Sequence, residues 1–249
     1  MSVRIIEGDC RCVSLGGPHD LAIVDPPYAD TSLEWDRIVQ GWIPAVAAAL
    51  KPSASIWLFA SMRHLMGQRI HAQMRRAGFR YSQDIVWEKQ NGTGFQNDRF
   101  RRVHEHALLF YRGDWSTVYH APQFTLDATA RQVRRKTRPT HMGHIESSSY
   151  TSVDGGPRLE RSVQEIRNEH GRAIHPTQKP VALVRKLIRY SCPPGGSVLD
   201  PFAGSCSTGI AARDEGCSAV CVEIDPAMVI KARERIAGGP IFATEAEPA

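Results

Sequence analysis

The stretch that decides the fold is Val198-Leu199-Asp200-Pro201-Phe202-Ala203-Gly204-Ser205-Cys206-Ser207-Thr208-Gly209. It begins as a short apolar run typical of a buried strand, continues as a turn of small residues, and ends in a helical pattern. Glu223 ends the next apolar run, 19 residues after Gly204. An acidic residue at about that distance from a glycine-containing turn is placed to bind ribose hydroxyls. The stretch predicts an α/β unit that binds a nucleoside; the alternative is a plain tight turn with Glu223 on the surface.

Apolar runs like this one recur along the chain and alternate with helical patterns. Most are continuous, as expected for strands covered on both faces. Helical patterns occupy Trp42–Leu50 and His64–Arg76, and a further apolar stripe contains Leu183, Val184, Leu187 and Ile188. The alternation predicts a doubly wound, mostly parallel sheet with helices on both faces. The seven expected strands are Val3–Ile6, Leu21–Val24, Ser55–Phe59, Asp84–Trp87, Ala107–Tyr111, Ser197–Leu199 and Ala219–Val222.

Residues 113–172 interrupt this rhythm. They contain a basic run, Arg131–Arg138, and few apolar residues, so they cannot build a core of their own. We interpret them as a functional insertion, partly flexible, within a domain formed by residues 1–112 and 173–237. Residues 238–249 are small and polar, and we expect a disordered tail.

The charge of the chain is concentrated in one window. The 249 residues carry a formal net charge of +5. Nine basic and three acidic residues lie between Arg99 and Arg138, which gives this window +6 and leaves the rest at −1. Such a window predicts contacts with phosphates, although a solvated basic loop is the alternative.

Composition and the N-terminus indicate where the protein works. No apolar run approaches the roughly 20 residues that cross a bilayer, and the start, MSVRIIEGDC, lacks a signal-peptide pattern. The six cysteines form no C-x-x-C pair, so we expect free thiols rather than a disulfide framework. These features predict a cytoplasmic protein with no membrane partner.

The sharpest local motif is Asp25-Pro26-Pro27-Tyr28, directly after the buried run Leu21–Val24. Side chains at the carboxyl end of a parallel strand project into the crevice where α/β proteins bind ligands. The motif presents a carboxylate, a backbone carbonyl fixed by proline and an aromatic ring together. That set suits an amino group on a planar ring; the alternative is a structural Pro-Pro turn.

A third motif, His175-Pro176-Thr177-Gln178-Lys179-Pro180, precedes the amphipathic helix. Thr177 or Gln178 is placed to cap this helix, and Pro180 suits its first turn. The segment is equally suited to fold over a ligand bound at the next strand.

Together these motifs resemble the β class of S-adenosylmethionine-dependent DNA amino-methyltransferases. Members carry D-P-P-Y, then a target-recognition region, then H-P-T-Q-K-P and D-P-F-x-G-S-G, and the match covers residues 3–112 and 173–237. The resemblance implies a Rossmann-like methyltransferase sheet of seven strands, S-adenosylmethionine as cofactor, and DNA as partner. It also makes a homodimer and a cognate restriction nuclease candidate partners. One departure is Cys206, which stands where the family has its last glycine.

The resemblance also implies the roles of individual residues. Asp25, Pro26, Pro27 and Tyr28 are the predicted catalytic residues, and an opening aspartate favours adenine N6 as the target. Gly8-Asp9-Cys10 looks like the family's contact to the cofactor adenine. The predicted cofactor-binding residues are Asp9, Cys10, Asp25, His175, Thr177, Lys179, Asp200, Phe202, Ala203, Gly204, Ser205, Ser207, Glu223 and Ile224. The predicted DNA-binding residues are Arg99, Arg101, Arg102, Arg131, Arg134, Arg135, Lys136 and Arg138.

Other functions are compatible with parts of this pattern. A cytosine-N4 or RNA amino-methyltransferase would use the same site. A nicotinamide dehydrogenase would share the acidic ribose contact without needing D-P-P-Y, and a non-catalytic DNA-binding relative would lose Asp25 or Tyr28. Two further blocks, Trp87-Glu88-Lys89 and His104-Glu105-His106, fall where the family has later conserved blocks. We expect no metal, because the spacing of His104-Glu105-His106 suits no common zinc pattern.

Overall fold

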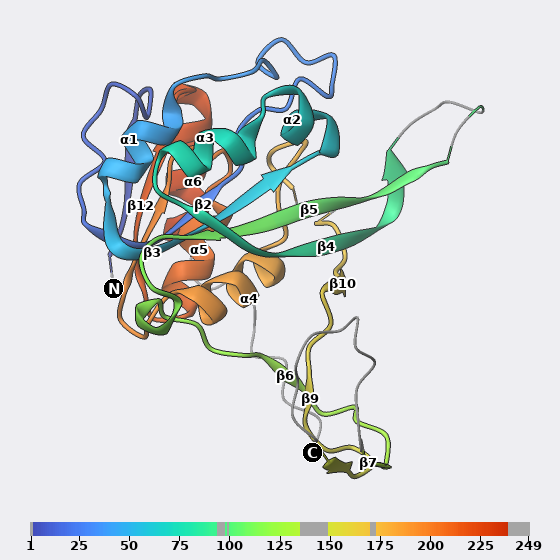
Figure 1. Ribbon diagram of the computed structural model, residues 1–249. Coiled ribbons are helices and arrows are strands. Elements are labelled where there is room, and N and C mark those ends of the chain that lie inside the picture. The colour runs from blue at the N-terminus through green and yellow to red at the C-terminus, as the bar shows by residue number, and fades with distance from the viewer. Residues whose placement is uncertain (1, 94–97, 99, 135–148, 170–172, 239–249) are drawn as a thin grey trace. The chain divides into compact units, whose positions relative to one another are not determined.

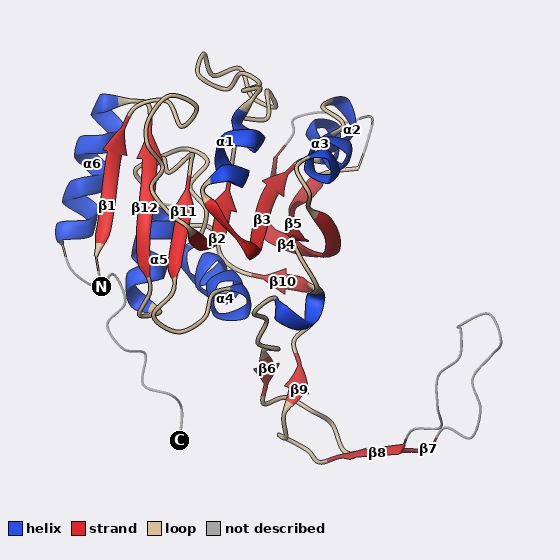
Figure 2. Ribbon diagram, turned by 60° about the vertical axis from the view of Figure 1, so that its left-hand side comes forward, coloured by secondary structure: helices blue, strands red, loops and turns tan. Residues whose placement is uncertain are grey.

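An eight-stranded sheet forms the centre of the larger of two units in this computed structural model (Figures 1 and 2). The structure describes residues 2–93, 98, 100–134, 149–169 and 173–238. In the described part of this sheet, β5 alone runs antiparallel to its neighbours. Across the sheet the strands are β1 (Val3–Glu7), β12 (Ser218–Glu223), β11 (Ser197–Asp200), β2 (His19–Val24), β3 (Leu50–Ala60), β5 (Arg102–Tyr111), β4 (Arg80–Thr93) and β10 (Val163–Glu165).

All seven predicted strands are present, and the mostly parallel α/β fold is confirmed. The predicted number of strands is wrong by one, because β10 joins the edge of the sheet. Val163 pairs with Val86 and Glu165 pairs with Glu88 in parallel register. Of the three residues of β10, only Gln164 is buried. The pairing therefore uses backbone groups and leaves no apolar run in the sequence.

Helices cover both faces of the sheet. They are α1 (Trp42–Ala48), α2 (Met62–Gly67), α3 (Ile70–Arg76), α4 (Val181–Ser191), α5 (Ser207–Asp214) and α6 (Pro226–Ala237). Side chains alternate along β2: Leu21 and Ile23 pack with α4 and α5, whereas Ala22 and Val24 pack with α1 and α3. Figure 2 shows α6 beside β1, at the edge of the sheet. Two apolar layers therefore enclose the strands.

The helix predicted over His64–Arg76 is two helices. Arg69 lies between them with a left-handed φ of 49°, which breaks the helical hydrogen-bond ladder. Ser61 caps α2 by accepting from the backbone N–H of His64 at 3.2 Å. The break lets α3 turn away from α2 and bury Ile70 and Met74 in the apolar layer against the sheet.

The described residues of the smaller unit, Pro122–Arg161, form two short antiparallel strand pairs. β6 (Phe124–Thr125) pairs with β9 (Arg158–Leu159), and β7 (Arg131–Arg134) pairs with β8 (Ser149–Ser152). The unit lies inside the predicted insertion, residues 113–172, and is shorter than it. A short 3₁₀ helix, η1 (Trp115–Thr117), precedes it in the larger unit. Residues 239–249, which hold most of the predicted tail, lie outside the described residues.

Among the described residues, no helix has both the length and the apolar composition required to span a bilayer.

Candidate active site

The site lies where β2 and β11 end side by side. Within the sheet, β2 lies between β11 and β3. The chain continues from β2 to β3 in one direction across the sheet and from β11 to β12 in the other, which makes this a topological switch point. Asp25 follows the last residue of β2, and Asp200 is the last residue of β11. A cavity of about 910 Å³ opens at this edge, a volume typical of small-molecule sites.

Every residue predicted from the sequence as catalytic or cofactor-binding lines this cavity. The structure therefore brings together segments from both ends of the chain, although their individual roles stay predictions. These residues are Asp9, Cys10, Asp25, Pro26, Pro27, Tyr28, His175, Thr177, Lys179, Asp200, Phe202, Ala203, Gly204, Ser205, Ser207, Glu223 and Ile224.

Two side chains hold the Asp25 carboxylate. The Tyr28 hydroxyl donates to one oxygen at 2.6 Å, and the Lys179 ammonium lies 2.6 Å from the other. Burial, followed by the charges of Asp25 and Glu105, raises the pKa of Tyr28 well above its ordinary value, so the phenol remains a donor. One face of the Tyr28 ring stacks on His64, with 5.4 Å between the ring centroids. The carboxylate is thus fixed in orientation at the end of β2.

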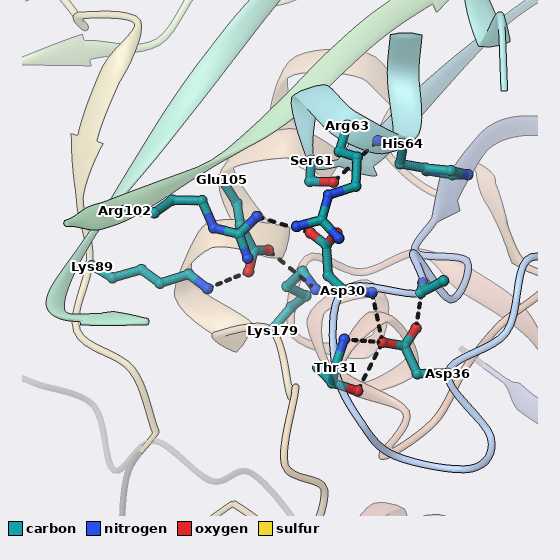
Figure 3. Close-up of polar contacts among 11 residues, drawn as sticks. Asp30, Thr31, Asp36, Ser61, Arg63, His64, Lys89, Arg102, Glu105 and Lys179 are labelled. Carbon is teal, nitrogen blue, oxygen red and sulfur yellow. Dashed lines mark hydrogen bonds and ion pairs between the residues drawn. The ribbon is translucent and has the colours of Figure 1, made fainter. Parts of the chain in front are cut away.

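A row of alternating charges continues from Lys179 across the cavity wall (Figure 3). The Lys179 ammonium lies 3.4 Å from Glu105, and Lys89 donates to the other oxygen of Glu105. Burial would raise the pKa of Glu105, but the two lysines outweigh it and lower that pKa to about 2. Glu105 and Lys89 are therefore functional candidates. The sequence assigned them no role, and they were noted only because they fall where the family has its later conserved blocks.

The loop after D-P-P-Y folds around Asp36. Its carboxylate accepts from the backbone N–H groups of Ala29, Asp30 and Thr31 at 2.8, 3.0 and 2.8 Å. Burial would raise the pKa of Asp36, yet these hydrogen bonds and that of the Thr31 hydroxyl lower it. Trp35 of the same loop contacts the His175 ring, with centroids 4.9 Å apart. The loop thereby closes one side of the cavity.

Asp30, two residues beyond Tyr28, forms ion pairs with two arginines. Arg102 donates to it at 2.8 Å, and Arg63 lies 3.5 Å from its other oxygen (Figure 3). The Asp30 side chain is 4% exposed, so this carboxylate is buried with its counter-ions. Arg102, predicted to bind DNA, anchors the loop after D-P-P-Y in the structure.

The glycine-containing turn is held by Glu223. Its carboxylate accepts from the backbone N–H of Gly204 at 2.7 Å and of Asp225 at 2.9 Å. Gly204 has a φ of 50°, and a Cβ built there would meet no protein atom within 4 Å. Cys206 also has a left-handed φ, 61°, which explains why glycine suits this position and why the departure is strained.

Asp200 and Asp9 complete the polar lining. Burial, reinforced by the charges of Asp25 and Glu223, raises the pKa of Asp200 to about 7, although hydrogen bonds from Thr208 and the Phe202 N–H oppose it. Asp9 is bound by Arg11, whose hydrogen bonds lower the pKa of the Asp9 carboxyl. Small residues in the turn and several carboxylates line the same cavity, a combination that fits an adenosine-containing cofactor.

The segment that carries Lys179 is not capped as predicted. Neither Thr177 nor Gln178 caps α4; instead Glu169 accepts from the Val181 N–H at 3.0 Å. Glu169 also binds Arg235 of α6 at 3.0 Å and accepts from the Gln178 amide. No sequence pattern pointed to Glu169, because its three partners lie 9, 12 and 66 residues further along the chain, at no regular spacing.

The predicted DNA-binding arginines are placed only in part. Arg101 is exposed beside Arg102 at the start of β5, and Arg131 is exposed on β7 in the smaller unit. The other predicted DNA-binding side chains lie outside the described part of the chain: those of Arg99, Arg134, Arg135, Lys136 and Arg138. Arg112, which contributes to the charge of the basic window, instead donates to the backbone carbonyls of Ala47, Leu50 and Lys51.

A family model of DNA methylases that covers N6 and N4 enzymes matches residues 19–234. The chain belongs to this family. It is an S-adenosylmethionine-dependent DNA methyltransferase. The Type II methyltransferase M.HinfI of Haemophilus influenzae is 28% identical over 261 residues, which cover 93% of this chain and 67% of that protein.

Solved structures share the fold of this DNA methyltransferase. M1.HpyAVI in complex with S-adenosylmethionine has a TM-score of 0.66 at 23% identity and covers 94% of this chain and 99% of its own. The cytosine-N4-specific PvuII DNA methyltransferase also has a TM-score of 0.66, at 16% identity, over 99% and 89% of the two chains. The predicted Rossmann-like methyltransferase architecture is confirmed.

Proposed function

We propose that this DNA methyltransferase modifies the N6 amino group of adenine. The observation that carries the proposal is the Asp25 carboxylate, held at the end of β2 by Tyr28 and Lys179 and open to the cavity. Each carboxylate oxygen has a second lone pair, so Asp25 can still accept from an incoming amine.

The exocyclic amine of adenine needs activation because its lone pair is delocalised into the ring. Asp25 and the carbonyl of Pro26 accept its two N–H groups, which turns the lone pair toward the cofactor side of the cavity. Acceleration arises from positioning and fixed charges. Glu223 and the turn after Asp200 would hold S-adenosylmethionine, which would supply the electrophilic methyl group and leave as S-adenosylhomocysteine, while Asp25 would take up the proton that the amine gives up. Tyr28 lines the same cavity beside Asp25, where its ring can contact the target base.

The cavity lies among the ends of strands and cannot admit a base that is still stacked in a duplex. The target nucleotide must be flipped out or lie in a single strand. Contacts to the DNA backbone then hold the duplex, for which Arg101 and the basic run of the insertion are the candidates. Residues 113–172, with the unit Pro122–Arg161 inside them, would supply target recognition.

Cytosine N4 carries the same pair of N–H donors, so geometry alone serves both bases. The choice of adenine rests on Asp25, since cytosine-N4 enzymes more often open this motif with serine. Unmethylated DNA and RNA should be incubated in parallel with the enzyme and tritiated S-adenosylmethionine, then digested to nucleosides for mass spectrometry. We expect N6-methyldeoxyadenosine from DNA. N4-methyldeoxycytidine, or methylation of RNA alone, would contradict the proposal.

A second prediction concerns the basic run. Replacing Arg134, Arg135 and Lys136 by glutamine should weaken DNA binding and reduce the slope of log K against log salt by about 3, because three phosphate contacts are lost. The affinity for S-adenosylmethionine should not change. Fluorescence anisotropy with a labelled duplex at several salt concentrations measures the slope. Replacing Arg75 and Arg76, exposed on α3, by glutamine is the control. An unchanged slope in the triple variant would make the run a solvated loop.

A further inference from the structure

Lys179, predicted to bind the cofactor, has a different set of partners in the structure. Its ammonium lies 2.6 Å from Asp25 and 3.4 Å from Glu105. It also lies 5.5 Å from the centroid of the Tyr28 ring and 5.2 Å from that of Phe59. Two carboxylates and two aromatic faces therefore surround the ammonium. We propose that Lys179 is a positioning residue that holds the Asp25 carboxylate toward the target amine; this inference rests on the proposed role of Asp25.

The backbone around Lys179 is fixed on both sides by one carboxylate. Glu169 accepts from the side chain of Gln178 and from the N–H of Val181. Pro180, between Lys179 and α4, limits the backbone further, and its carbonyl accepts from the N–H of Leu183 at 3.1 Å. The backbone of Lys179 is thus held rigidly, so its side chain loses little further conformational entropy when it pairs with Asp25.

Glu105 and Lys89 explain how a buried lysine can serve this purpose. The Lys179 side chain is only 7% exposed, and an isolated buried ammonium tends to lose its proton. Glu105 supplies a second carboxylate, and Lys89 neutralises the charge that Glu105 adds. Asp25, Lys179, Glu105 and Lys89 form an alternating row with no net charge, from β2 through the segment before α4 to β5 and β4.

The ionisation of the row agrees with this geometry. Burial would lower the pKa of Lys179, but attraction from Asp25 and Glu105 outweighs it and raises that pKa. Lys179 therefore remains an ammonium at neutral pH. The ammonium lies 2.6 Å from one oxygen of Asp25. Removing a cation beside a carboxylate makes protonation of that carboxylate easier, and a carboxylate must be charged to accept both hydrogens of an amine well.

The test compares the pH dependence of single-turnover methyl transfer in Lys179→Met with that in the unchanged enzyme. Methionine keeps a similar shape without charge. Lys51→Met is the matched control, because Lys51 pairs with Asp20 at 2.6 Å and does not line the cavity. The double variant Lys179→Met with Glu105→Gln removes one charge of each sign, which guards against misfolding of the single variant. Calorimetric titration measures S-adenosylmethionine binding in each protein.

We expect the acidic limb of the pH profile to move upward by about 1–3 pH units in both Lys179 variants and to stay in place in Lys51→Met. S-adenosylmethionine affinity should change little. If the acidic limb does not move in the Lys179 variants, the positioning role is wrong. If, in addition, these variants lose much of their affinity for S-adenosylmethionine, Lys179 is a cofactor-binding residue instead. Failure of the proposed function is seen separately, as a different methylated base or as turnover that survives Asp25→Ala.

Discussion

Replacing Asp25 by alanine is expected to slow methyl transfer to DNA by about 10³-fold. The substitution removes the acceptor that orients the target amine and leaves only the Pro26 carbonyl in that position. The fold should survive, because Lys179 keeps Glu105 as a counter-ion and Tyr28 loses a single hydrogen bond. S-adenosylmethionine binding should be largely retained, since eight of the fourteen predicted cofactor-binding residues lie between Asp200 and Ile224.

Single-turnover transfer of a tritiated methyl group to a duplex, together with calorimetric titration of the cofactor, separates the two effects. Asp20→Ala provides the control on the same strand, because Asp20 lies at the opposite end of β2 and pairs with Lys51. It should lower stability slightly and leave transfer unchanged. Full turnover in Asp25→Ala would remove Asp25 from the reaction, whereas equal losses of turnover and cofactor affinity would make it a cofactor ligand instead.

The sequence predicted the centre of this site because two local signals coincide there. Strands buried on both faces appear as continuous apolar runs, and residues directly after such runs lie at one edge of a parallel sheet. Asp25 and Asp200 each stand at the end of such a run. Topology then brings them together, although 175 residues separate them in the chain. Resemblance to a family added the roles that local pattern could not give.

The sequence did not predict β10, the break between α2 and α3, or the ion pair of Glu105 with Lys89, because no clear local sequence pattern marks them. β10 pairs through its backbone with β4 and buries only Gln164. The break between α2 and α3 falls at Arg69, with no proline to mark it. Glu105 and Lys89 come from neighbouring antiparallel strands, so their pairing depends on register rather than on spacing. Long-range ion pairs of this kind require the tertiary structure, because side-chain charge alone does not identify a partner.

Replacing Glu169 by alanine is expected to destabilise the protein and to weaken cofactor binding together. Glu169 joins three elements: it accepts from the Val181 N–H that begins α4, from Gln178, and from Arg235 of α6. The Glu169 and Arg235 side chains are 19% and 10% exposed. Loss of the carboxylate leaves the Arg235 charge largely buried without its acidic partner, which costs about 3 kcal/mol. For a chain of this length, the melting temperature should fall by about 6–12 °C.

The effect on the cofactor follows from the other contacts of Arg235. Its guanidinium donates to the carbonyl of Ser205 at 2.9 Å and to the hydroxyl of Ser207 at 3.2 Å. Both residues line the cavity, Ser205 in the turn and Ser207 at the start of α5. Without Glu169, the arginine and the segment before α4 both lose their anchor, so the two sides of the cofactor site loosen at once. A drop in S-adenosylmethionine affinity should therefore accompany the loss of stability.

Glu215→Ala separates these consequences. Glu215 also binds two cations, Arg185 at 2.5 Å and Arg189 at 2.6 Å, but it does not line the cavity. Its removal should lower the melting temperature while cofactor affinity stays constant, because its partners touch neither the turn nor the segment before α4. Thermal unfolding with and without S-adenosylmethionine measures both quantities in each variant. If Glu169→Ala were stabilised by the cofactor as strongly as Glu215→Ala, Glu169 would support the fold without shaping the cofactor site.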